Sequence, residues 1–148
     1  MNAVRTAAGF TLIEMLLCVA IISLLVGMAS PVYISFVERN DLSIATQTIA
    51  AMLTRAQTYA RAANFDDAWS VDVQSTTVTL FEGITFATRN TTRDEAYSIP
   101  GSVTPGFTGD IVFARFTGVP TSTPTVTLTG LTGDTRTITL NAKGVVDY

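Results

Sequence analysis

A single carboxylate lies near the start of a long apolar stretch in this 148-residue chain. Glu14 comes five residues after Gly9, and it is the only charged residue between Phe10 and Val37. An ionisable side chain at the centre of a bilayer costs about 2.5–3.5 kcal/mol, so one inside a stretch of this length is a functional candidate by default. The chemistry open to Glu14 is pairing with a cation, and that partner has to be identified.

The other residue types exclude several classes of chemistry. The chain has no histidine, and its one cysteine, Cys18, lies in the apolar stretch. These counts rule out a disulfide framework, a Cys/His zinc site and a histidine-based triad. Asp66-Asp67 could begin a calcium site, but a helix-terminating acidic turn is preferred, because hard cations need several converging oxygens. Asp94-Glu95 lies in a mixed-charge segment that we expect to be a solvated loop, so we expect no enzyme site and no cofactor.

The length of the apolar stretch favours a membrane anchor. Residues 10–37 number about 28, and about 20 suffice to cross the hydrocarbon layer as a helix. A secretory signal peptide, the nearest alternative, usually has an apolar region of about 7–15 residues. The polar leader 1–9 carries Arg5 and no acid, which places it in the cytoplasm by the positive-inside tendency. We therefore expect a single-pass membrane protein with residues 38–148 outside the cytoplasm.

The residues Gly9-Phe10-Thr11-Leu12-Ile13-Glu14 form a recognisable motif, in which a leader ends in glycine and an apolar helix follows. The motif resembles the class III signal of type IV pilins and type II secretion pseudopilins. The resemblance implies cleavage between Gly9 and Phe10 by prepilin peptidase, and N-methylation of the new Phe10 amine. It also implies insertion in the inner membrane. The implied partners are an assembly platform, membrane lipid and other pilins or pseudopilins in a helical filament at the cell surface or in the periplasm.

Cleavage after Gly9 would supply the cation that Glu14 requires. The Phe10 amine would then lie at the membrane edge, one helical turn from Glu14 and near the positive end of the helix dipole. In a filament, Glu14 of an incoming subunit could pair with the Phe10 amine of its neighbour. We therefore assign both residues to assembly. A glutamate solvated by lipid headgroups is the alternative.

A helical pattern continues beyond the apolar stretch. Small and apolar residues recur three or four positions apart from Leu42 to Ala63, which predicts a helix over about 38–65 that ends near Asp67. We expect this stripe to be a core face against a sheet rather than a coiled-coil seam, because it is short and rich in alanine. Gly27 and Pro31 together predict a kink in the preceding part of the helix, and many pilins carry a proline at the corresponding place.

After Asp67 the apolar period changes to two, which predicts strands with one buried and one threonine-lined face. The segments are 69–73, 77–80, 125–129 and 137–140, with further candidates at 84–86, 111–116 and 145–146. Gly130 and Gly133-Asp134 predict a turn between two paired strands. Residues 88–109, which contain two Pro-Gly pairs, are expected to form a loop. The prediction is an α+β fold: a long N-terminal helix packed against an antiparallel sheet head, as in pilins.

Two head segments resemble the GspH/FimT group of minor pilins and pseudopilins. They are the helix end at 56–64 and the strand, glycine turn and strand at 138–146, supported by Ile111-Val112-Phe113 with Gly118. Some members of this group bind DNA through basic C-terminal residues. Here the basic residues Arg136 and Lys143 are offset by Asp134 and Asp147, and the chain has a net charge of −3. We therefore do not expect this protein to share the nucleic-acid binding of those members.

Three functions remain open from the sequence. The first is a structural subunit, of the minor class, of a type IV pilus-like filament. The second is a minor pseudopilin of a type II secretion system, which shares all the chemistry above. The third is a membrane-anchored enzyme, which is distant because the chain lacks histidine, a reactive cysteine and a phosphate-binding glycine loop.

Overall fold

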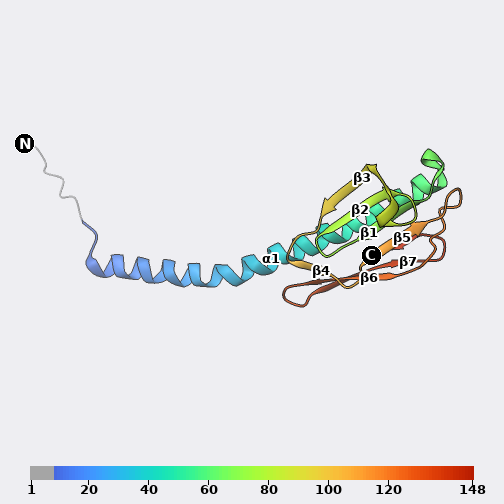
Figure 1. The fold of residues 1–148 in the computed structure, drawn as a ribbon. Coiled ribbons are helices and arrows are strands. Elements are labelled where there is room, and N and C mark those ends of the chain that lie inside the picture. The colour runs from blue at the N-terminus through green and yellow to red at the C-terminus, as the bar shows by residue number, and fades with distance from the viewer. Residues whose placement is uncertain (1–8) are drawn as a thin grey trace, which may run out of the picture. The chain divides into compact units, whose positions relative to one another are not determined.

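The computed structural model describes residues 9–148, apart from the side chains of residues 28–32. Its first element is a long helix, α1 (Leu12–Arg61), and short 3₁₀ turns and strands follow it (Figure 1). The chain separates into two compact units, one ending at Phe36 and the other spanning Val37–Tyr148. The α+β class predicted from the sequence is confirmed.

The first unit consists of the N-terminal part of α1, which is apolar on all its sides. Its large apolar side chains that the structure describes are between 51% exposed, at Ile21, and 78% exposed, at Leu12. Free Cys18 is also exposed on this part of the helix. A helix without a polar face is ordinarily covered by other protein or by lipid.

Gly27 and Pro31, the residues of the predicted kink, both lie within the bounds of α1. A Cβ added at Gly27 would meet no atom within 4 Å. The side chain of Pro31 lies outside the described residues, so the kink stays a prediction. Among the residues that the structure describes, no helix combines the length and apolarity needed to cross a membrane.

The second unit places two antiparallel four-stranded sheets along the C-terminal part of α1 (Figure 1). The N-terminal sheet has the order β3-β2-β1-β5, with β1 (Trp69–Val73), β2 (Thr77–Glu82), β3 (Asn90–Ser98) and β5 (Gly109–Phe113). The C-terminal sheet has the order β4-β6-β7-β8, with β4 (Val103–Pro105), β6 (Thr125–Gly130), β7 (Thr135–Leu140) and β8 (Val146–Asp147). The head therefore has two sheets where the sequence predicted one.

The stripe on α1 is the core face that its spacing predicted. Its buried members are at most 2% exposed and belong to one cluster with both sheets: Leu42, Ala45, Ile49, Met52 and Ala56. Tyr59 packs edge-on against Trp69, with 4.8 Å between ring centroids. The alternative of a coiled-coil seam for this stripe is wrong, because the two sheets of the same chain already cover it.

The helix ends earlier than predicted, at Arg61, and a 3₁₀ turn covers Asn64–Asp66. Phe65 adopts a left-handed backbone, with φ 59°. Tertiary contacts hold the turn: the Trp69 indole donates to the Asn64 carbonyl at 3.0 Å, and Arg115 pairs with Asp66 at 2.8 Å. The helix boundary therefore depends on contacts with residues up to 49 positions away.

Most of the predicted strands are present, but two predictions between residues 84 and 109 are wrong. Residues 84–86 form a turn and the start of a 3₁₀ helix, and the expected loop 88–109 contains β3 and β4. β3 has no alternating apolar pattern because it is an edge strand, joined to β2 by backbone pairing. Charged residues on edge strands are common, since they discourage pairing with other chains.

β1 and β2 are buried on both faces, whereas a wet face was expected. Ser70, Asp72 and Thr79 are at most 5% exposed. The loop between β2 and β3 covers this outer face: Ser70 Oγ donates to the Gly83 carbonyl at 2.5 Å, and Phe86 packs edge-on against Phe81. β6 and β7 do show the expected one-sided burial.

Candidate functional site

The predicted processing and assembly residues lie together at the exposed start of α1. Gly9 and Phe10 precede the helix, and Glu14 lies in its first turn. A Cβ added at Gly9 would meet no atom within 4 Å, so this structure imposes no steric reason for a glycine there. A requirement for glycine at this position would have to come from a partner that binds the segment.

Thr11 is a functional candidate that the sequence reasoning missed. Its hydroxyl oxygen accepts a hydrogen bond from the backbone N–H of Glu14 at 3.3 Å, which caps the helix directly before Leu12. Thr11 and Glu14 have the spacing of a capping box, in which a threonine and a glutamate satisfy the unpaired N–H groups of the first turn. The Thr-x-x-Glu spacing was the available signal.

The start of α1 also provides an electrostatic reason for a carboxylate at position 14. The first turn of a helix presents unpaired N–H groups and a partial positive charge, which stabilise an anion by typically 0.3–1 kcal/mol. That is less than the cost of an unpaired charge in lipid, about 2.5–3.5 kcal/mol at the bilayer centre. The helix end would therefore offset only part of the cost of Glu14 in an apolar environment, and a cationic partner would offset more of it.

A comparison with protein families decides what this segment is. Residues 4–30 match the prokaryotic N-terminal methylation motif. No curated protein and no solved structure matches the chain. The motif supports a type IV pilin-like or pseudopilin subunit, with prepilin peptidase processing and N-terminal methylation, and points to a structural subunit rather than an enzyme. The match ends at residue 30, so the GspH/FimT resemblance of the head stays a prediction.

The mixed-charge segment 89–95 is not the solvated loop that was expected. All of it except Arg89 belongs to β3, and its side chains form ion pairs: Arg89 with Asp94 at 2.7 Å, Arg55 with Glu95 at 2.7 Å, and Arg93 with Glu82. Hydrogen bonds to Tyr59 and Glu95 raise the pKa of Arg55 above its ordinary value. These carboxylates are engaged in holding β3, the loop and α1 together.

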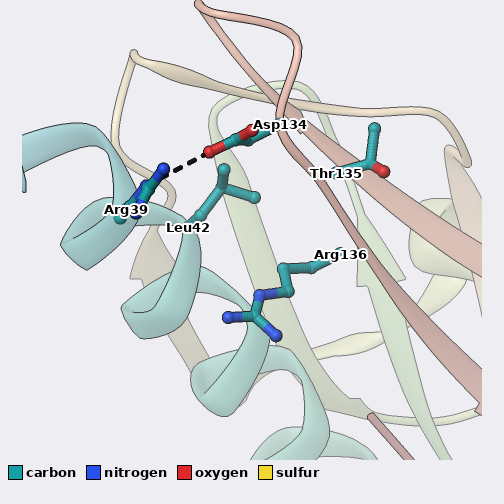
Figure 2. A pocket seen from close by; sticks show the side chains of 5 residues that line it. All are labelled: Arg39, Leu42, Asp134, Thr135 and Arg136. Atoms are coloured by element: carbon teal, nitrogen blue, oxygen red, sulfur yellow. Dashed lines mark ion pairs between the residues drawn. The ribbon is translucent and has the colours of Figure 1, made fainter. Parts of the chain in front are cut away.

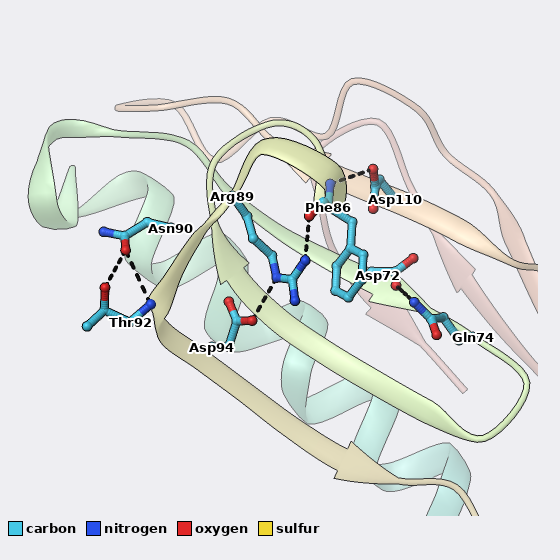
Figure 3. Close-up of polar contacts among 8 residues, drawn as sticks. All are labelled: Asp72, Gln74, Phe86, Arg89, Asn90, Thr92, Asp94 and Asp110. Carbon is cyan, nitrogen blue, oxygen red and sulfur yellow. Dashed lines mark hydrogen bonds and ion pairs between the residues drawn. The ribbon is translucent and has the colours of Figure 1, made fainter.

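Asp72 is the most perturbed carboxylate of the head. It faces Asp110 across the β1–β5 pairing, and its oxygen accepts a hydrogen bond from Gln74 at 2.6 Å (Figure 3). Burial raises the pKa of Asp72, the negative charge of Asp110 raises it further, and Gln74 and Arg89 oppose the shift. Within the described residues, no group of three or more metal-ligating side chains is found here or elsewhere.

Replacing Asp72 with asparagine is expected to stabilise the head at neutral pH. A carboxyl group whose pKa is raised by folding favours the folded state while it is protonated, and that contribution is lost as pH rises through the raised pKa. The asparagine side chain cannot ionise but can still accept the Gln74 hydrogen bond. Urea unfolding between pH 4 and 8 should show a gain that grows with pH for D72N and no such trend for D147N on exposed β8. A gain that is independent of pH would contradict the assignment.

Proposed function

We propose that the protein is a structural subunit, of the minor class, of a type IV pilus-like filament. In this proposal prepilin peptidase cuts the chain between Gly9 and Phe10, and the Phe10 amine is methylated. Residues 10–37 hold the mature subunit in the inner membrane until the assembly platform moves it into the filament. The head, residues 38–148, stays outside the cytoplasm throughout.

The observation that carries the proposal is the match to the methylation motif across residues 4–30, which includes the Gly9–Phe10 bond and Glu14. The exposed apolar side chains at the start of α1 support it, because lipid or neighbouring helices would cover them. The ion pairs of the head support a structural role as well, because they join its elements, as Arg55 of α1 does with Glu95 of β3.

A minor pseudopilin of a type II secretion system is the second candidate, since the same motif serves both kinds of subunit. Recovery of the mature protein from sheared surface filaments would favour the pilus. Its retention in the periplasm, with loss of secretion on deletion, would favour the pseudopilin.

Intact-mass measurement of protein from native membranes tests the processing step. We expect a chain that begins at Phe10 and carries one added methyl group. The variant G9A should be poorly cut or uncut, because a small, flexible residue is needed where the chain enters the peptidase. The control A7S changes the leader without touching the Gly9–Phe10 bond and should be cut normally. A mature chain that begins at Met1 or after Ala29 would refute the proposal.

A further inference from the structure

The turn between β6 and β7 carries an unexpected apolar side chain. Leu131 is 78% exposed, more than any other large apolar residue of the unit Val37–Tyr148. Backbone bonds close the turn on both sides of it: Gly130 N–H donates to the Asp134 carbonyl, and Gly133 N–H to the Gly130 carbonyl. Turns of this kind usually carry polar residues, so an exposed leucine is unusual at position 131.

A buried carboxylate fixes where this turn lies. Glu38 is 3% exposed, and its Oε1 accepts a hydrogen bond from the Thr132 backbone N–H at 2.6 Å. Gly130 is needed for this approach, because an added Cβ would run into the Glu38 carboxylate and lie 2.8 Å from Leu42. The tip of the turn is therefore held against the residue at which the head begins.

The position of Glu38 in the chain places the turn near a lipid surface. This step rests on the proposed function, in which residues 10–37 cross the membrane. A helix of about 28 residues is about 42 Å long, which matches the 40–45 Å of a bilayer with its headgroups. Glu38 would therefore emerge at the outer edge of the headgroups. Leu131 would lie beside it, because the next residue, Thr132, donates a backbone hydrogen bond to Glu38.

The charged side chains around the turn do not oppose its placement near lipid, because several of them already have partners in the head. Arg39 pairs with Asp134 at 3.4 Å, and Asp41 accepts a hydrogen bond from Ser102. Arg39 and Asp134 line a groove beside α1 with a volume of about 250 Å³, and Arg136 extends into it from β7 (Figure 2). Arg136 also lines a groove with Ser43, Thr46 and Gln47, which follow Glu38 on α1 by five to nine residues, so Arg136 lies farther than Glu38 from the proposed lipid surface. Since the local charges nearly cancel, Leu131 supplies the attachment.

We propose that the β6–β7 turn is the part of the head that contacts the bilayer, with Leu131 inserted among the lipid headgroups. The contact fixes the head above the membrane before assembly. It would be broken when the subunit leaves the bilayer.

The test uses the full chain, with C18A as background, reconstituted in phosphatidylethanolamine and phosphatidylglycerol vesicles. Single cysteines at L131C, V119C and I22C carry an environment-sensitive fluorophore, and brominated acyl chains serve as quencher. Val119 is the matched control. It is 44% exposed, and the neighbouring Gly118 carbonyl accepts from Gln57, about 28 Å beyond Glu38 along the helix. We expect a blue shift and quenching at positions 131 and 22, and neither at 119.

Each other outcome overturns the inference in a distinguishable way. If the probe at 22 is quenched but the probe at 131 behaves like that at 119, the proposed contact of the turn with lipid is wrong. The membrane anchor of the proposed function is unaffected by that result. If 22 is also unquenched, the membrane anchor of the proposed function fails as well. A blue shift at 131 that rises with protein concentration, without lipid quenching, would assign the turn to a second subunit.

Two further variants test whether Glu38 positions the turn. E38A removes the acceptor of the Thr132 N–H and should reduce quenching at 131, whereas E38Q keeps an acceptor oxygen and should retain it. Near-ultraviolet circular dichroism checks that each variant is folded. Equal quenching in E38A and E38Q would show that Glu38 does not position the turn.

Discussion

The variant E14L is expected to be inserted and cleaved normally, and to be recovered poorly in filaments. Leucine removes the cost of a charge in lipid, so insertion should be unchanged or improved. The Gly9–Phe10 bond is untouched, so cleavage should continue. The neighbour's Phe10 amine would lose its counter-charge in an apolar bundle, and breaking such a pair typically costs about 3–5 kcal/mol. That corresponds to a loss of about a hundredfold or more in incorporation.

The measurement is the fraction of mature protein recovered in sheared filaments, relative to the unaltered chain. The variant E14Q isolates the charge, because glutamine can also occupy this position of a capping box with Thr11. We expect E14Q to fail in assembly nearly as severely as E14L, and M15L, one residue further along the helix, to assemble normally. Equal incorporation of E14L would show that Glu14 is not an assembly contact. That result would fit a subunit at the filament tip, which has no neighbour to pair with.

The variant I49A is expected to destabilise the head by about 2–5 kcal/mol, the usual range when a buried isoleucine is cut back to alanine. Ile49 is fully buried in the core cluster that joins α1 to both sheets. Domains of this size have a free energy of unfolding of about 5–15 kcal/mol, so the loss is a large part of the total.

The matched control for this variant is I44A, on the same helix. Ile44 is 48% exposed, so its truncation should change the free energy of unfolding by less than about 0.5 kcal/mol. Both variants are measured by urea unfolding of residues 37–148, which we expect to fold as a monomer with mixed helix and strand. Equal effects of I44A and I49A would mean that the stripe on α1 is not the core face, and an insoluble fragment would mean that the head needs a partner.

The N-terminal motif could be read from the sequence because it is local. Cleavage, methylation and helix capping depend on contiguous residues, from Gly9 to Glu14. Residues that are neighbours in the sequence are also neighbours in space, so the motif needs no tertiary contact. The stripe from Leu42 to Ala63 and the alternation in β6 and β7 were also readable. In both cases one face is buried and the other is wet, which leaves a period in the sequence.

The apolar period of two is lost in strands that are buried on both faces and in strands that are held mainly by backbone hydrogen bonds. Ser70 and Asp72 look like the wet face of β1, yet the β2–β3 loop covers them through Phe86. β3 is polar along its length because its hydrogen bonds to β2 are independent of side-chain hydrophobicity. No local pattern marks either feature.

The chain by itself therefore determined the motif of its N-terminal segment and the class of its fold, since both follow from neighbours in sequence. Only the tertiary structure decided where α1 ends, which carboxylates are buried and which turn stands beside Glu38. The bond from Glu38 to Thr132 joins residues 94 positions apart. A contact over such a separation depends on how both sheets pack around the helix, and no neighbouring residue records it.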